Sequence, residues 1–321
     1  IPKYEYKVEG QFGKGGTSLE LPGEIEVNFK NKADITPTTG YTLHPAFNFG
    51  GENLSGIWVG KFEITGAINS PTIKPNESSL RSQTVSSFFN AGRAMQNVGN
   101  PYGFSNTKGD THMMKNMEWG AVAYLSQSKN GKYGNPNYTG ANKELYINNN
   151  SNYVTGCSAG APSTGGVNGC TNTYNVENHG TGASTTGTIY GVYDMSGGMA
   201  EYVMGVLADP SGNPISGGDA TWNSGFKGMY EDGTMNTTGQ DFPNAKYYDL
   251  YTETTGIKGD ATNADKTQGW YQDFAKFIAS GRPWFRRGTS YNNTTVAGAF
   301  GYDNSIGHAN SYTTARMVAK P

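Results

Sequence analysis

Two cysteines are the most reactive side chains in the sequence. Cys157 and Cys170 lie in one stretch rich in Gly, Ser and Asn, GCSAGAPSTGGVNGC. A pair that closes one short loop is typical of a disulfide in an oxidising compartment, where the cross-link reduces the entropy of a loose loop. We therefore predict a disulfide between Cys157 and Cys170. Two free surface thiols in a cytosolic protein are the alternative.

The sequence holds no pattern of zinc or nucleic-acid binding. Its four histidines are scattered, and no CxxC or HxxxH spacing accompanies the cysteines, so we expect no zinc site. The formal net charge is -2, and Lys and Arg form no run. Nucleic acids and anionic membranes need a clustered basic surface, so neither is an expected partner.

The composition predicts a loop-rich protein. Gly, Asn, Ser, Thr and Tyr are abundant, whereas 16% of residues are charged and 35% are hydrophobic. No stretch approaches 18 consecutive apolar residues, so we expect no direct contact of this chain with a membrane. Because the chain begins at Ile1, we expect that a signal or anchor once preceded it. The predicted location is extracellular or at a cell surface, with a phage particle as another setting.

Hydrophobic periodicity predicts two helices among many strands. One helix is expected within 76–98, where apolar residues recur at helical spacing, and another within 113–128. The first 66 residues cluster or alternate apolar residues between Gly, Pro and Asn breaks, which favours strands. Further strands are expected at 188–197, 200–206, 284–293, 297–303 and 313–321, a short helix or turn within 265–281, and long loops over 133–188 and 207–268.

Four parts of the chain, in order, share motifs with a known family. They are GIWVGKFEITG at 56–66, MKNMEWGAVAYL at 114–125, YGVYDMSGGMAEYV at 190–203, and WFRRGTSYNN with TTARMV between 284 and 318. The third resembles the N-V-x-D-M-x-G-N-V-W-E-W signature of the formylglycine-generating-enzyme and sulfatase-modifying-factor family. The resemblance implies one α+β domain over 1–321 with a C-type-lectin-like fold. Its short antiparallel strands, including a β-rich opening part at 1–66, and two main helices would support long loops.

The resemblance does not imply the family's activity. Enzymes of this family use reactive cysteines near the C-terminus, and no cysteine follows Cys170. Related iron-dependent sulfoxide synthases need a histidine cluster that this sequence lacks. We therefore expect no enzymatic activity, since function has to come from a site rather than from a fold.

The resemblance implies a calcium site that lacks one of its side-chain ligands here. Family members often bind calcium through the N-V-W-E segment, and here Gly198 stands at the Asn position. Glu201 remains, and it could bind calcium together with the backbone carbonyls of Met199 and Ala200. The alternative for Glu201 is a buried carboxylate that accepts hydrogen bonds from loop N–H groups. No other cofactor is expected.

Residues 286–314, which we name the C-terminal segment, combine framework positions with Tyr, Asn, Ser, Thr, His and Asp. This pattern resembles the variable proteins of diversity-generating retroelements, whose C-terminal residues are rewritten by adenine-directed mutagenesis and then selected for binding. The framework positions, within the segment and beside it, are Trp284, Phe285, Arg287, Gly288, Ala297, Gly298, Phe300, Arg316 and Val318.

The genetic code supports this resemblance independently. Changing both adenines of an AAC or AAT codon yields Asn, Tyr, Asp, His, Ser, Thr, Ile, Gly and several others, but never Lys, Glu, Gln, Met or Trp. None of these five types occurs from Arg286 to Thr314, although each occurs elsewhere in the chain. The composition is therefore the one that adenine-directed mutagenesis would leave.

We predict a non-catalytic ligand-binding and display protein. Tyr offers a large contact area at low entropic cost, and Ser, Asn and Gly adapt their hydrogen bonds. The expected partner is a protein or glycan on a cell or phage surface, and Trp284, Phe285, Phe300 and Val318 are expected in the core. The candidate ligand contacts are Arg286, Ser290, Tyr291, Asn293, Thr295, Tyr302, Asn304, His308, Asn310, Ser311, Tyr312 and Thr314.

A fixed-sequence adhesin or phage tail-tip lectin-like domain is the alternative. Such a domain would bind a glycan with calcium, and Asp303 with Asn304 could serve that site. A diversified protein predicts variation clustered in the C-terminal segment. A lectin predicts a fixed site whose binding depends on calcium.

Overall fold

The computed structural model describes residues 1–10, 13–97, 102, 109–215, 226–229, 235–240, 242–253 and 269–321. In these ranges two α-helices, α1 (Val85–Ala94) and α2 (Asn116–Ser126), accompany many short strands in small sheets. The protein is therefore mostly β, and the prediction of an α+β class is wrong. The C-type-lectin-like fold is not confirmed. The abundance of Gly, Asn, Ser and Thr explains the low helix content, because these residues lose entropy in a helix or compete for its hydrogen bonds.

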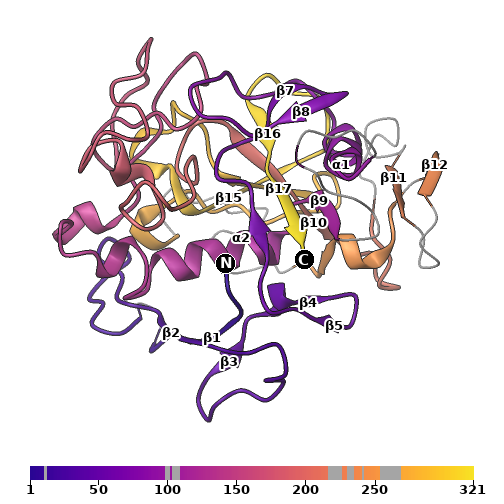
Figure 1. The fold of residues 1–321 in the computed structure, drawn as a ribbon, viewed down its shortest axis with the longest axis horizontal. Coiled ribbons are helices and arrows are strands. Elements are labelled where there is room, and N and C mark those ends of the chain that lie inside the picture. Colours follow the sequence, from indigo (N-terminus) through magenta and orange to yellow (C-terminus); the bar gives the residue numbers. More distant parts are fainter. Residues whose placement is uncertain are drawn as a thin grey trace.

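The largest sheet is built around β10 (Ala200–Leu207), all of whose residues are buried. β14 (Trp284–Gly288) pairs antiparallel with β10, and β15 (Gly298–Ser305) pairs antiparallel with β14. β13 (Asp249–Tyr251) and β16 (Thr313–Ala315) run parallel to β10. Both ends of the C-terminal segment are thus held against one buried strand (Figure 1).

The other strands form small sheets. β17 (Met317–Lys320) lies between β6 (Trp58–Val59) and β9 (Asp110–Met113), antiparallel to both. Near the N-terminus, β1 (Tyr4–Lys7) lies between β2 (Glu26–Phe29) and β3 (Thr42–Leu43). Three two-stranded pairs are β4 (Asn48–Phe49) with β5 (Glu52–Asn53), β7 (Thr65–Ala67) with β8 (Ser70–Thr72), and β11 (Phe226–Met229) with β12 (Met235–Gln240).

Helix α2 lies between the N-terminal sheet and the largest sheet (Figure 1). On one side the Tyr4 hydroxyl donates to the Ala121 carbonyl at 2.7 Å. On the other the Trp119 indole N–H donates to the Ala299 carbonyl at 2.8 Å. One hydrophobic core therefore includes residues of β1, α2 and β15.

Both helices lie within their predicted ranges but are shorter. α1 begins after Thr84, whose hydroxyl accepts a hydrogen bond from the Ser87 N–H at 3.2 Å. The residues before Thr84 turn instead, with φ of 60° at Asn76 and Ser82. Residue 98, the predicted end, lies outside the described residues. Neither α1 nor α2, nor any other helix in the described ranges, is long and apolar enough to cross a membrane.

The strand prediction is confirmed at 200–206, and it is confirmed in part for the first 66 residues and for the C-terminal strands, because β14 ends at Gly288 and residues 289–293 form no strand. The strand predicted at 188–197 is wrong, because the chain turns there. Asp194 has a φ of 60° and Gly197 a φ of 72°, and neither value fits an extended strand.

The long loop predicted at 207–268 is wrong in part, because β11, β12 and β13 lie within it. The rest of that prediction falls on residues 216–225, 230–234, 241 and 254–268, which lie outside the described residues. Within 265–281, where a short helix or turn is expected, the chain makes a turn at Trp270–Gln272 in which Tyr271 and Gln272 have φ of 60° and 64°, so it is not a regular helix.

Candidate ligand-binding surface

The framework residues are buried, as expected. The relative exposure of Trp284, Phe285 and Val318 is 0%, 3% and 2%, and Phe300 is partly buried against the same core. These side chains fix β14, β15 and β17 to the interior. The turns between the strands of the C-terminal segment carry its exposed residues.

A small surface cavity lies within the C-terminal segment. Its volume is about 110 Å³. Arg286 on β14 forms an ion pair with Asp303 on β15, and both side chains are partly exposed. The cavity is lined by Arg286, Ser290, Asn293 and Tyr312, which were predicted as ligand contacts, and by Ala200, Phe274, Thr289 and Asp303.

A tight turn after β14 forms one rim of the cavity. The Ser290 N–H and hydroxyl both donate to Oδ1 of Asn293, at 2.9 and 2.8 Å. The backbone N–H of Tyr291 donates to the Gly198 carbonyl at 2.9 Å, which ties the turn to the residues just before β10. Thr295 is exposed in the next turn along the chain.

The loop between β15 and β16 holds Tyr312 and three more of the predicted contacts. The Tyr202 hydroxyl on β10 donates to the His308 carbonyl at 2.9 Å. The Tyr312 N–H donates to Oδ1 of Asn310 at 2.7 Å. Ser311 and Tyr312 are exposed, while the side chains of His308 and Asn310 are partly buried.

Tyr302 and Asn304 lie on the other face of β15. Side chains alternate along a strand, so both point away from the face that carries Asp303. Tyr302 packs against Phe285, with ring centroids 6.2 Å apart. Asn304 is buried, and its amide donates to the Phe277 carbonyl at 2.7 Å. We therefore leave Tyr302 and Asn304 out of the proposed surface.

Thr314 has a structural role as well. It is fully buried in β16, and its hydroxyl donates to the Leu80 carbonyl at 2.6 Å. A buried hydroxyl bound in this way cannot contact a ligand without unfolding the strand. Thr314 is left out for that reason.

Two residues outside the C-terminal segment join the surface, and sequence reasoning missed both. The Tyr153 ring lies edge to face against the Tyr291 ring, with centroids 5.5 Å apart. The guanidinium carbon of Arg81 lies 4.1 Å from the centre of the Tyr153 ring. Tyr153 has a φ of 60°, uncommon for a bulky residue, and the Ser79 N–H holds its carbonyl at 2.9 Å. No spacing in the sequence marks this pair.

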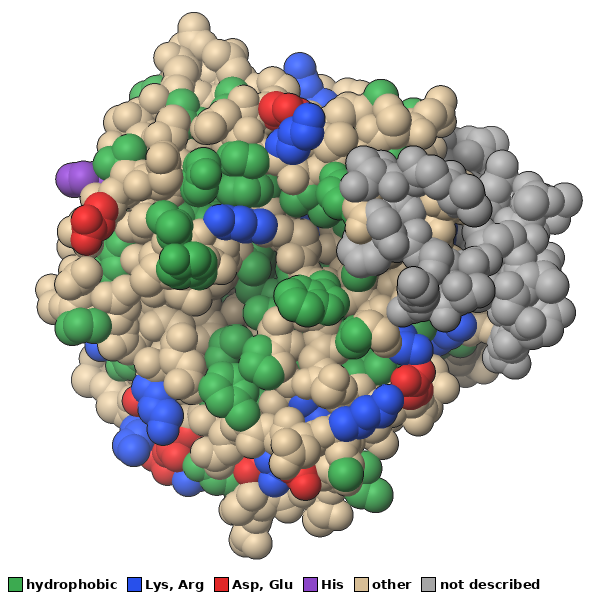
Figure 2. Space-filling view, viewed as in Figure 1, with side chains coloured by type: hydrophobic (Ala, Val, Ile, Leu, Met, Phe, Trp, Pro, Cys, Tyr) green, Lys and Arg blue, Asp and Glu red, His purple; other side chains and the backbone are tan. Residues whose placement is uncertain are grey.

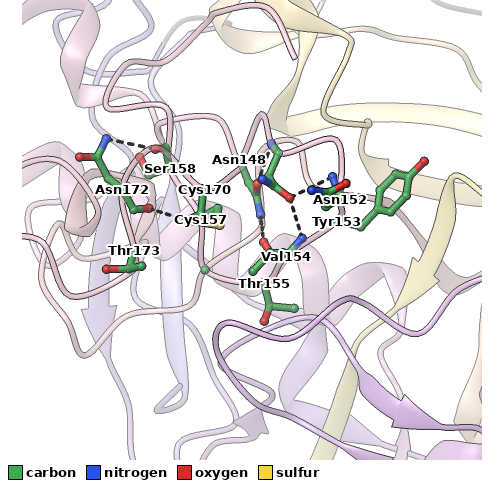
Figure 3. The surroundings of a disulfide bond; sticks show 12 residues. Asn148, Asn152, Tyr153, Val154, Thr155, Cys157, Ser158, Cys170, Asn172 and Thr173 are labelled. Atoms are coloured by element: carbon green, nitrogen blue, oxygen red, sulfur yellow. Dashed lines mark hydrogen bonds between the residues drawn. A yellow bond between two sulfur atoms is a disulfide. The ribbon is translucent and has the colours of Figure 1, made fainter. Parts of the chain in front are cut away.

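Cys157 and Cys170 form the predicted disulfide (Figure 3). In the loop that they close, a Cβ at Gly166 would lie 2.9 Å from carbons of the Tyr291 ring. Figure 3 shows Tyr153 pointing away from the disulfide, toward the C-terminal part of the chain. The disulfide loop therefore supports Tyr291 from a second side. The cross-link is consistent with a protein outside the cytoplasm.

Glu201, the candidate calcium ligand, is bound by Arg316. The carboxylate is fully buried and accepts hydrogen bonds from Nε of Arg316 at 3.1 Å and from a second guanidinium nitrogen. Burial raises the pKa of Glu201 to about 7, and the guanidinium opposes that rise. Calcium at Glu201 would have to displace Arg316. Within the described ranges, no group of three or more His, Cys, Asp or Glu side chains is arranged to hold a metal ion.

Three of the four family-like motifs meet at this buried ion pair. Glu63 accepts a hydrogen bond from the Met199 N–H at 2.8 Å. Burial raises the pKa of Glu63 well above its usual range, and repulsion from Asp194 and Glu201 adds to the rise. Arg316 supplies the positive charge. Glu63, Asp194, Glu201 and Arg316 thus stabilise β10 and the residue that follows β16, and these four side chains are not accessible to a ligand.

Gly298, at the start of β15, is a framework position at which no larger residue fits. A Cβ there would lie 2.1 Å from a carboxylate oxygen of Asp273. We expect Gly298→Ala to lower the free energy of unfolding by about 1–3 kcal/mol, as overpacking does, in urea denaturation. Gly281→Ala is the matched control, because no atom lies within 4 Å of that position. Equal stability of the two variants would contradict this account.

Comparison with known proteins identifies neither a family nor a function for this chain. No protein-family model matches the chain, and no curated protein sequence matches it. A function therefore has to be inferred from the residues that meet on the surface.

Proposed function

We propose that this protein binds and displays ligands without catalysis, and that the C-terminal segment is its variable binding surface. The observation that carries the proposal is the cavity of about 110 Å³ around which Arg286, Ser290, Asn293 and Tyr312 meet. These residues come from β14, from the turn after it and from the loop before β16. Residues from both ends of the segment thus contribute to one concave site.

Burial separates the positions that must stay constant from those that can vary. Trp284 and Phe285 are in the core, whereas Thr295, Ser311 and Tyr312 are exposed. Exposed substitutions usually change stability by less than about 0.5 kcal/mol. A protein diversified by adenine-directed mutagenesis needs this separation, because each new surface has to fold on the same framework.

The residue types favour a protein or glycan ligand on a cell or phage surface. Tyr153, Tyr291 and Tyr312 supply aromatic contact area, and Ser and Asn side chains between them supply adaptable hydrogen bonds. Arg81 and Tyr153 give this surface a constant part beside the variable one. We propose an extracellular or cell-surface location, or a phage particle, in keeping with the disulfide.

The geometry favours this proposal over a calcium-dependent lectin. Asp303 is engaged in an ion pair with Arg286, and the Asn304 side chain is buried and bound to the Phe277 carbonyl. A calcium ion at these two residues would have to break both interactions. The glycan-binding alternative therefore needs a rearranged β15.

Deep sequencing of the 3′ end of the gene across its source population, together with a nearby template copy, tests the proposal. We expect substitutions at adenine positions within codons 286–314, concentrated at the exposed turns. The codons of Asn304 and Thr314 contain adenine but should be spared, because both side chains are buried. An invariant segment would overturn the diversification. Calcium-dependent binding on a glycan array would then support the lectin.

A further inference from the structure

A second cavity lies on the sheet β6–β17–β9, away from the residues that line the cavity of the C-terminal segment. Its volume is about 240 Å³. Trp58 of β6 and Val318 of β17 contribute from the sheet, and Ile73, Met95 and Tyr102 contribute from segments packed on it. Figure 2 shows hydrophobic side chains around a hollow near the centre of this face, where β17 lies in Figure 1. Trp58 has a relative exposure of 69%, so a large aromatic side chain at this cavity remains open to a ligand.

One residue of the lining carries a positive charge. Among the described residues that line the cavity, Lys61 alone is charged. Its ammonium nitrogen lies over the rings of Tyr174 and Phe62, at 5.1 and 5.5 Å from their centres. In the described part of the chain no carboxylate forms an ion pair with Lys61. Burial lowers the pKa of Lys61, which indicates that its charge is partly desolvated without a compensating anion.

The size of the cavity limits the ligand. An apolar cavity of about 150 Å³ is large enough to bind benzene. A volume of about 240 Å³ therefore leaves room for a phenyl-sized body and a short acidic tail. The flexible four-carbon stem of lysine allows the Lys61 ammonium to meet a carboxylate at the end of such a tail.

We propose that this cavity binds a small amphipathic carboxylate. Its apolar body would lie among Trp58, Ile73 and Met95, and its carboxylate would pair with the ammonium of Lys61. The ion pair would be partly shielded from water, so it should contribute more than an exposed pair does. This site does not depend on the proposed function of the C-terminal segment, because the two cavities share no lining residue.

Titration calorimetry of the full chain with 3-phenylpropionate and its neutral amide tests the proposal. We expect the carboxylate to bind about tenfold more tightly, as one charge-assisted hydrogen bond would provide. Lys61→Met keeps the apolar stem, so it should bring the two affinities together while the amide still binds. Lys129→Met, at an exposed lysine, should leave the preference unchanged.

A second pair of variants tests the apolar body. Trp58→Ala should weaken the binding of both probes without affecting the fold, because the indole is largely exposed. Tyr190→Ala removes an aromatic ring that is 86% exposed but does not line the cavity, and it should change neither affinity. Equal affinity of acid and amide, a preference that survives in Lys61→Met, or no saturable binding of either probe would each overturn the proposal.

Discussion

Replacing Arg316 by methionine is expected to lower the free energy of unfolding by about 3–5 kcal/mol, the usual loss when one partner of a buried ion pair is removed. Glu201 would lose both of its guanidinium hydrogen bonds. The carbonyls of Gly60 and Tyr193 would each lose a donor at 2.8 Å. Methionine can fill much of the space but can satisfy none of these acceptors. Urea denaturation of the two proteins measures the difference.

The loss should depend on pH in a defined direction. Without Arg316, nothing opposes the rise that burial causes in the pKa of Glu201, so this carboxyl can escape the penalty by binding a proton. The deficit of Arg316→Met should therefore be larger at pH 8 than at pH 5. Adding Glu201→Gln should recover part of it at pH 8. Arg282→Met, at an exposed arginine, should stay within about 0.5 kcal/mol of the natural protein; an Arg316→Met deficit that small would contradict the account.

Helix α2 and strand β10 could be predicted because their signals are local. β10 is a short apolar run, and α2 is an apolar stretch whose Glu118 side chain accepts the Lys115 N–H at 2.8 Å at the start of the helix. The predicted α+β class is wrong because it rests on the family resemblance and not on the hydrophobic pattern of this chain. Strands of two to four residues such as β3, β6 and β16 are too short to give a periodic signal.

The binding surface could be predicted from the sequence only where the residue type itself indicates an exposed position. Ser290, Asn293 and Tyr312 lie in turns, so their small or polar types indicated their place. Asn304 is an asparagine like Asn293, but it lies in a strand. The alternation of side chains along the strand decides which face Asn304 occupies. Tyr153 could not be found, because it is brought to Tyr291 by contacts between segments that lie far apart in the sequence.

The binding surface is supported by a buried carboxyl group that no sequence motif marks. Asp273 is fully buried, and its carboxylate accepts the Phe300 N–H of β15 at 2.9 Å. The same carboxylate fills the space beside Gly298. Burial raises the pKa of Asp273 to about 8, and hydrogen bonds from β15 together with Arg287 oppose the rise. The strand that carries Asp303 therefore rests on a side chain that is largely protonated at neutral pH.

Asp273 should make the stability of the protein fall as pH rises. Its pKa is about 8 in the folded chain and 3.8 for an ordinary aspartate, so between these values the folded protein binds more protons than the unfolded one. Asp273 alone should therefore contribute a decline in stability of up to about 1.4 kcal/mol per pH unit from pH 4 toward pH 8. Asp273→Asn cannot ionise but keeps an oxygen for the Phe300 N–H, so it should flatten this decline and be more stable than the natural protein at pH 8.

The slope of stability against pH in single variants distinguishes the contribution of Asp273 from that of the other carboxyl groups. Burial also raises the pKa of Glu63, Glu144 and Glu201, so a decline from these groups should remain in Asp273→Asn and become smaller when Glu144→Gln is added. Asp209 is an exposed aspartate whose pKa is lowered by hydrogen bonds from Asn213, and Asp209→Asn should leave the slope between pH 5 and pH 8 unchanged. If the urea midpoints of the natural protein and of Asp273→Asn change in the same way over that range, Asp273 is ionised in the folded state. The support of β15 would then have to come from its charge, paired with Arg287, rather than from a neutral carboxyl.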